Sequence, residues 1–152
     1  MSERSLSGIT GSLGGGALCE QIKPVLAFKP ALQTSASADG EIVDRKGYNS
    51  ADIDIAIGDF TGSATLATYI VEHGDAENLS DAADVVAADV GYGDINCVVT
   101  NGTDENSLKR IKLDLRGLKR YFRLRLDRTG ADMELEQSAV AVLGAYTEKA
   151  PV

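Results

Sequence analysis

Charged and apolar residues alternate strictly through residues 109–128 (KRIKLDLRGLKRYFRLRLDR). A period of two is the spacing of side chains on one face of a β-strand. The pattern therefore predicts two strands, joined near Gly117, that pair with each other and have one buried and one wet face. The residues expected on the buried face are Ile111, Leu113, Leu115, Phe122, Leu124 and Leu126.

Further short segments read as strands separated by turn signals. Residues 51–58 (ADIDIAIG) alternate isoleucine with smaller or acidic residues, and residues 64–73 (ATLATYIVEH) are rich in β-branched and aromatic side chains. We expect these two segments to form a hairpin around the turn at 59–63. Strands are also expected at 95–100 and at 138–146, the last one well buried.

The remaining segments carry weaker signals. Pro24 and Pro30 interrupt the apolar segment 22–33, which excludes a central strand or a long helix and favours an edge strand or an extended connector. The acidic, alanine-rich stretch after residue 74 is expected to hold a short helix near residues 80–88. Roughly six to eight short strands with at most one short helix indicate an all-β single domain, a β-sandwich or jelly-roll-like fold.

The first residues differ in composition from the rest. Residues 1–21 are rich in Ser and Gly, with three consecutive glycines at 14–16, and such a segment loses much entropy when it becomes ordered. We predict a flexible N-terminal arm over residues 1–21 and a β-sandwich domain over residues 22–152. No apolar run approaches the about 18 residues of a membrane-spanning helix, and no signal-peptide pattern is visible, so an unexported, cytoplasmic protein is expected.

Charge is unevenly distributed along the chain, whose net charge is -8. Residues 109–128 hold nine bases and two acids, a sum of +7, while the rest holds six bases and twenty-one acids, a sum of -15. This asymmetry suggests complementarity with an acidic protein surface or with another copy of the chain. The alternative is a mixed, solvated surface, since the exposed positions of a sheet are polar anyway. The candidate protein-docking face consists of Arg110, Lys112, Arg116, Lys119, Arg120, Arg123, Arg125 and Arg128.

The sequence offers no catalytic, cofactor-binding or metal-binding constellation, and we expect none of these sites. His73 is the only histidine and no Gly-x-Ser-x-Gly motif accompanies it, so we interpret His73 as a surface or hairpin-end residue. The acidic residues lack the spacing of a calcium loop. We expect them to face solvent or to pair with the basic strands.

Nucleic acid is a second possible partner for the basic face. Lysines and arginines follow phosphates, and Tyr121 is available for stacking on a base. The chain as a whole is acidic and few aromatics share that face, whereas a nucleic-acid-binding domain is usually basic. A protein surface that carries acids fits better.

Five short motifs, taken in order, resemble those of a family of virus proteins. The family comprises the decoration proteins of tailed-bacteriophage capsids, also called cement or head-stabilising proteins. The resemblance covers residues 46–146; Leu79 stands where the pattern usually has a bulky residue before Ser-Asp, and the Gly-rich arm has no counterpart. The motifs are Lys46-Gly47-Tyr48, ADIDIAIGDF at 51–60, YIVEHGD at 69–75, LSDAAD at 79–84 and KRYFRLRL at 119–126.

The resemblance implies a non-enzymatic protein on the outside of an icosahedral shell. Such a domain forms a homotrimer at three-fold or pseudo-three-fold positions and bridges neighbouring capsomers. The implied partners are the major capsid protein and other copies of the chain, with no membrane, and the implied location is the capsid exterior after assembly in the host cytoplasm. Two alternatives stay open: another virion component, such as a tail or head–tail joining subunit, and a carbohydrate- or ligand-binding β-sandwich.

Overall fold

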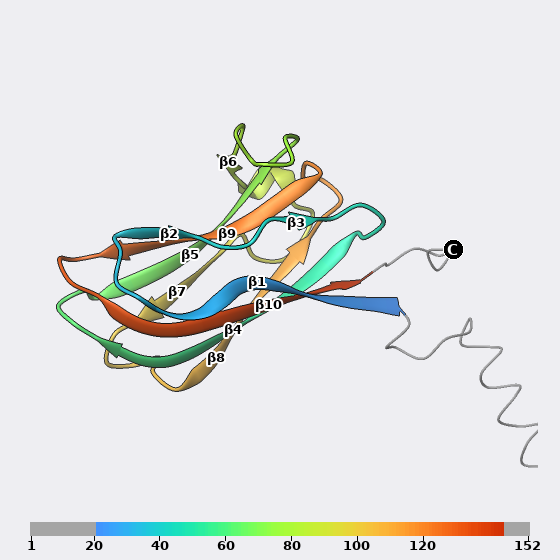
Figure 1. Cartoon of the computed structure of the whole chain (residues 1–152). Helices are drawn as coiled ribbons and strands as arrows, with labels where there is room; N and C mark the ends of the chain where they lie inside the picture. Colours follow the sequence, from blue (N-terminus) through green and yellow to red (C-terminus); the bar gives the residue numbers. More distant parts are fainter. Residues whose placement is uncertain (1–20, 145–152) are drawn as a thin grey trace, which may run out of the picture.

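The structure, a computed structural model, describes residues 21–144 as two antiparallel β-sheets packed face to face (Figure 1). Most of the predicted arm and residues 145–152 lie outside the described residues. Sheet A has the strand order β1-β10-β4-β8, and sheet B has the order β2-β9-β5-β6, with β3 also paired to β9 and β7 to β5. The prediction of an all-β sandwich is confirmed. The strands are β1 (Ile22–Gln33), β2 (Ser37–Asp39), β3 (Val43–Asp44), β4 (Ser50–Thr61), β5 (Leu66–Gly74), β6 (Ala83–Asp84), β7 (Asn96–Thr100), β8 (Ser107–Asp114), β9 (Tyr121–Thr129) and β10 (Glu134–Gly144).

The core lies between the two sheets and is built by alternate residues of the long strands. All six apolar residues predicted for the buried face of 109–128 are at most 1% exposed, which confirms that prediction. Phe28 and Tyr69 meet edge to face, with ring centroids 6.0 Å apart. The Tyr69 hydroxyl donates to Oε1 of Gln137 at 3.2 Å, so this buried polar pair is satisfied.

Two predicted strand pairings are wrong. β8 and β9 do not pair with each other, because β8 is an edge of sheet A and β9 lies inside sheet B. β4 and β5 do not form a hairpin either: β4 pairs with β10 and β8, whereas β5 pairs with β9, β6 and β7. The alternation of side chains determines which face of a strand is buried. Two strands can bury these faces against each other from opposite sheets just as well as side by side in one sheet, so the alternation does not determine pairing.

The segment with two prolines is an edge strand, as expected. β1 pairs only with β10, and Pro30 falls within a register shift between Phe28 and Ala31. A bulge at this place fits a residue that has no N–H to donate to the ladder. The expected late strand is confirmed as β10, which lies in the interior of sheet A.

The predicted helix near residues 80–88 is wrong. This stretch contains β6 and one turn of 3-10 helix, η1 (Ala87–Asp89). Val85 is 3% exposed, and its N–H donates to the carbonyl of Val71 on β5 at 2.8 Å. Pairing with the sheet edge therefore holds the chain extended, because it buries Val85 and satisfies its backbone at once.

Candidate functional site

The eight residues of the candidate docking face do not lie on one face of the molecule. They form three groups: one on β8 in sheet A, one in the loop between β8 and β9, and one on β9 in sheet B. The outer faces of the two sheets point in opposite directions, since both inner faces enclose the core. The three groups are Arg110 and Lys112, then Arg116, Lys119 and Arg120, and finally Arg123, Arg125 and Arg128.

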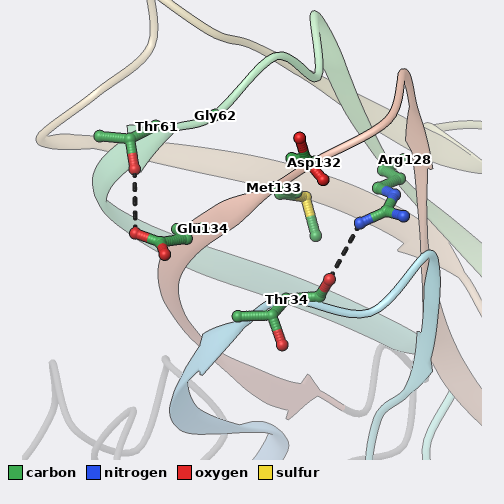
Figure 2. Close-up of a pocket in the computed structure, with 7 residues that line it drawn as sticks. All are labelled: Thr34, Thr61, Gly62, Arg128, Asp132, Met133 and Glu134. Atoms are coloured by element: carbon green, nitrogen blue, oxygen red, sulfur yellow. Dashed lines mark hydrogen bonds between the residues drawn. The ribbon is translucent and has the colours of Figure 1, made fainter.

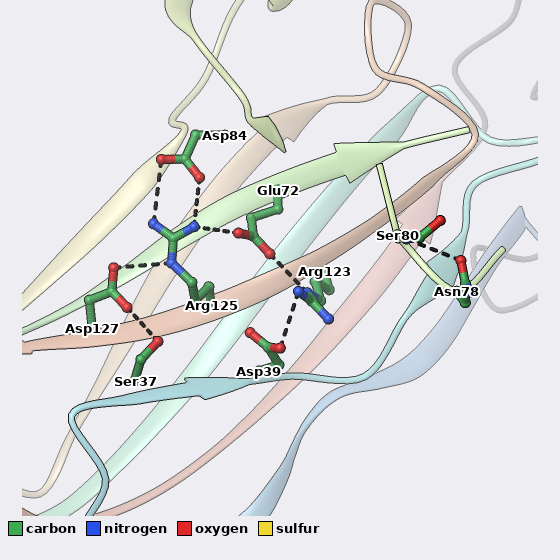
Figure 3. A network of polar contacts seen from close by, with 9 residues as sticks. All are labelled: Ser37, Asp39, Glu72, Asn78, Ser80, Asp84, Arg123, Arg125 and Asp127. Carbon is green, nitrogen blue, oxygen red and sulfur yellow. Dashed lines mark hydrogen bonds and ion pairs between the residues drawn. The ribbon is translucent and has the colours of Figure 1, made fainter. Parts of the chain in front are cut away.

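Arg125 is held by three carboxylates on the outer face of sheet B (Figure 3). Its Nε donates to Oδ2 of Asp127 at 3.0 Å and its Nη1 to Oδ1 of Asp84 at 2.7 Å. The same Nη1 also donates to Glu72. These charge-assisted hydrogen bonds, first the one to Asp84, raise the pKa of the Arg125 guanidinium.

Arg123 extends this network toward the edge of sheet B. Its Nε lies 2.8 Å from Oε2 of Glu72, and its Nη2 lies 3.1 Å from Oδ2 of Asp39 (Figure 3). The side chain of Glu72 is only 7% exposed, and that of Arg123 is 18% exposed. Counted with Asp84 and Asp127, two guanidinium groups face four carboxylates. The outer face of β9, which the sequence suggests is positive, is thus neutralised within the molecule.

Arg110 meets two acids on the neighbouring strand of sheet A. Its Nε lies 3.0 Å from Oδ1 of Asp52 and 3.1 Å from Oδ1 of Asp54. Only the contact with Asp54 has hydrogen-bond geometry, and Oδ1 of Asp52 is buried without a hydrogen-bond partner among the described residues. Burial and the charge of Asp54 raise the pKa of the Asp52 carboxyl. The expectation that acids pair with the basic strands is confirmed here.

The loop between β8 and β9 carries three exposed basic residues. The side chains of Arg116, Lys119 and Arg120 are 62%, 43% and 50% exposed. Arg116 binds Asp114 through two hydrogen bonds of 2.9 and 3.0 Å, which lower the pKa of the Asp114 carboxyl to about 2. Arg120 pairs with an exposed acid of β3, Asp44, at 2.9 Å.

Arg45 is a basic residue of this same end that sequence reasoning missed. Its Nε donates to the backbone carbonyl of Lys119 at 2.9 Å, and its Nη2 donates to that of Leu118. It therefore braces the loop from outside the basic segment. No pattern in the sequence signals this contact, because the partners are backbone atoms more than seventy residues away.

Two shallow hollows are lined by described residues, and neither contains a catalytic arrangement. One, about 530 Å³ in volume, lies at the far end of the sandwich (Figure 2). Arg128 reaches across it to the carbonyl oxygen of Thr34 at 2.9 Å, and the hydroxyl of Thr61 donates to Glu134 at 3.3 Å. The other follows the bulged end of β1 on the outer face of sheet A, between Pro30 and Gln137.

His73 is buried at the end of the hairpin of β5 and β6, so of its two predicted positions the hairpin end is confirmed and the surface is wrong. It lies at the end of β5 with its side chain 8% exposed. Its Nδ1 accepts a hydrogen bond from the backbone N–H of Lys119 at 3.2 Å, and its Nε2 lies 3.7 Å from Oδ2 of Asp89. Burial lowers the pKa of His73. In the described part of the chain no serine hydroxyl hydrogen-bonds to it, and no cluster of His, Cys, Asp and Glu could hold a metal ion.

Within residues 21–144 no helix is long and apolar enough to cross a membrane. Cys97 is half-buried on β7 as a free thiol, and burial raises its pKa. The second cysteine, Cys19, lies outside the described residues.

Comparison with known proteins identifies a shared fold. No protein-family model matches the chain, and neither does any curated protein sequence. The chain is similar to VP2 in the subviral particle of infectious bursal disease virus, with a TM-score of 0.52, 11% identity, and coverage of 86% of this chain and 34% of that chain. The Gx strain of the same virus gives a TM-score of 0.50 at 10% identity, covering 86% of this chain and 33% of that chain.

These similarities concern the fold alone. The chain spans about a third of the length of the two viral proteins. It is also similar to the SPBc2 prophage-derived protein YomS, with a TM-score of 0.45, 11% identity, and coverage of 80% of this chain and 91% of that chain.

Proposed function

We propose that the chain is a structural protein of a tailed-bacteriophage virion, bound to the outside of the capsid, where it stabilises contacts between capsomers. The proposal takes the major capsid protein and further copies of the chain as partners and assigns no enzymatic activity. The resemblance of residues 46–146 to decoration proteins supports it. The fold shared with VP2 of a subviral particle supports it as an analogy between folds.

The observation that carries the proposal is that separate motifs of the resemblance meet in space. Asp81 accepts hydrogen bonds from the backbone N–H groups of Asp75 and Ala76 at 2.8 and 3.1 Å, which ties the motif at 79–84 to the motif at 69–75. Asp84 binds Arg125 at 2.7 Å and so ties the motif at 79–84 to the motif at 119–126. Motifs that match only by their order in the sequence thus form one connected structure. They are residues 69–75, 79–84 and 119–126.

The docking contacts are proposed to come from the loop between β8 and β9. Arg116, Lys119 and Arg120 are each at least 43% exposed, whereas Arg123 and Arg125 are 18% and 23% exposed and are held in the network of sheet B. An incoming acidic surface reaches Lys119 and Arg120 without breaking a buried pair, whereas Arg116 is held by the buried carboxylate of Asp114. Arg123 and Arg125 instead stabilise the fold of the chain itself.

Charge reversal in this loop tests the docking role. In co-sedimentation with capsids that lack the chain, Lys119→Glu and Arg120→Glu are expected to lower occupancy several-fold at moderate salt, because they replace attraction by repulsion. The matched control is Lys29→Glu on β1, whose side chain is 71% exposed. Equal occupancy of all four proteins would contradict docking by the loop. Failure of the unaltered chain to bind any capsid would contradict the proposed function.

The number of copies is a separate part of the proposal. The resemblance implies a homotrimer, which light scattering tests directly against the chain mass of 16.0 kDa. A ring of many copies would instead favour a tail or head–tail joining subunit.

A further inference from the structure

The outer face of sheet A holds an unusual share of exposed apolar residues. Eight large hydrophobic residues are exposed in the described part of the chain, and four of them lie on strands of sheet A. They are Leu26, Leu32, Leu108 and Val140, with exposed fractions of 43%, 54%, 64% and 39%. Buried neighbours in sequence place Leu26 and Val140 on the outer face. Leu32 and Leu108 lie on the same face, because they are opposite the exposed residues Glu136 and Ala56 in the ladders.

Two of these four residues, Leu26 and Val140, belong to a strip along β1 and β10. Leu26 lies opposite Val140 in the ladder, and Pro24 lies opposite Val142. The alternate residues of β10, among them Ala141, are buried, which places Val140 and Val142 on the outer face. We call Ile22, Pro24, Leu26, Val140 and Val142 the apolar strip.

The strands beside the apolar strip carry charges of both signs. Val140 lies opposite Asp54 on β4, and Asp54 lies opposite Arg110 on β8; in the next row Val142, Asp52 and Lys112 follow in the same way. Two acids and two bases therefore border the strip. This border is balanced, although the chain as a whole carries a net charge of -8.

The outer face of sheet B is different. The network of Arg123 and Arg125 covers it, and of the eight exposed large hydrophobic residues only Val98 lies on a strand of this sheet. The two outer faces thus have separate characters, one closed by its own ion pairs and the other apolar with a polar border. An apolar centre with a polar rim is the composition of a protein interface.

We infer that a second copy of this chain covers the outer face of sheet A, with the apolar strip of one copy packed on the apolar strip of the other. This inference goes beyond the proposed function and rests only on its premise that the chain assembles with itself. A strip of this kind is complementary to an identical strip, and its balanced border brings no net repulsion between two acidic copies. Contact between equal patches is isologous and has two-fold symmetry.

The geometry favours packing of two sheets A face to face over pairing of their β1 edges. Pro24 and Pro30 remove two N–H groups from β1, and the N–H of Glu41 already occupies the carbonyl of Ala27 at 2.8 Å, so edge-to-edge pairing of β1 is disfavoured. Four strands about 4.8 Å apart and about eight residues long cover roughly 500 Å². Two such faces bury about 1,000 Å², which reaches the size of a specific interface.

Charged substitutions in the apolar strip test the inference. Val140→Lys is expected to weaken self-association of the full chain about tenfold or more in sedimentation velocity, because it buries an unpaired charge in the contact. Leu26→Lys on the edge strand is a second variant should Val140→Lys fail to fold, as judged by circular dichroism. Val98→Lys is the matched control, since Val98 is 44% exposed but belongs to sheet B; it should associate like the unaltered chain.

The outcomes separate this inference from the proposed function. A two-fold contact gives an even number of copies, so a mass of two or six times 16.0 kDa supports it. A monomer, a trimer, or association that a folded strip variant leaves unchanged would overturn it. A monomer that still binds capsids would overturn this inference and the self-assembly part of the proposed function but not the proposed capsid binding. A strip-dependent dimer that binds no capsid would overturn the proposed function and leave this inference standing.

Discussion

Glu72 is the residue on which the charge network of sheet B depends. It is buried between Arg123 and Arg125 and contacts both guanidinium groups. Each arginine has at least one further acid at its outer side, but Glu72 alone joins them. Loss of its charge would leave two partly buried guanidinium groups with fewer carboxylate partners. This is costly because burying an unpaired charge away from water is unfavourable.

We predict that Glu72→Gln lowers the free energy of unfolding by about 2 kcal/mol, since breaking a buried ion pair costs more than an exposed one. Urea denaturation at neutral pH measures this. The control is Glu41→Gln, which removes the same charge from an exposed pair with Lys29 (side chains 43% and 71% exposed) and should cost less than about 0.5 kcal/mol. Equal effects of the two changes would show that the network does not stabilise the fold.

His73 makes the stability of the chain depend on pH. Burial lowers its pKa although Asp89, Asp75 and Asp81 act in the opposite direction, and Lys119 adds to the lowering. Unfolded histidine binds a proton with a pKa of about 6.5, so below that pH the unfolded state binds more protons than the folded one. Stability is then fully present above about pH 6.5 and is lost as pH falls through the lower, folded pKa.

We therefore predict that the free energy of unfolding decreases between about pH 7.5 and pH 5.5. His73→Asn keeps an acceptor for the N–H of Lys119 but does not titrate, so it should show a smaller decrease over the same range. Chemical denaturation at several pH values compares the two proteins. The same decrease in both would assign the effect to other groups. Asp52 is no candidate, because its raised pKa gives a change of opposite sign.

At the scale of elements, the sequence predicted correctly which face of each strand is buried but not which strands pair with each other. In the basic segment 109–128 the alternation identified all six buried apolar residues, because burial of alternate residues depends on the strand itself. Pairing depends on how the chain crosses between sheets. Between β4 and β5, and between β8 and β9, the chain crosses from sheet A to sheet B. A short turn segment looks alike in a hairpin and in such a crossing.

The crossing between β8 and β9 depends on one close approach. A Cβ atom at Gly117 would overlap the carbonyl oxygen of Asp89 in the 3-10 turn. Next to it, Leu118 is 2% exposed and donates its N–H to the carbonyl of Leu115 at 3.1 Å. Gly117 thus lets this loop pack tightly against the segment that also faces His73.

We predict that Gly117→Ala costs about 2 to 3 kcal/mol of stability, because backbone atoms on both sides must shift. Gly47→Ala is the control: Gly47 has a φ of +87° and no atom within 4 Å of the added Cβ, so only the left-handed conformation is penalised, by about 1 kcal/mol. Thermal unfolding ranks the two variants. A milder effect at Gly117 than at Gly47 would contradict the packing of this loop.

At the scale of the whole molecule, charges that are neighbours in sequence are separated in space. The basic segment suggested one positive face, yet its residues meet acids from β2, β4, β5 and β6. Long-range pairing of this kind cannot be deduced from a local charge sum, since the sum contains no information on partners. What remains available for other molecules is the loop with Arg116, Lys119 and Arg120, and the apolar outer face of sheet A.

These two surfaces should respond differently to salt. Docking through the loop depends on charge, and the screening length falls from about 10 Å at 0.1 M salt to about 3 Å at 1 M, so capsid occupancy should decrease as sodium chloride is raised. Contact through the apolar strip depends on burial of apolar surface, which sulfate strengthens, so the oligomer should persist or tighten in sodium sulfate. Co-sedimentation and sedimentation velocity on the same samples measure both. Dissociation of the oligomer by salt would mean that ion pairs, not the strip, join the copies.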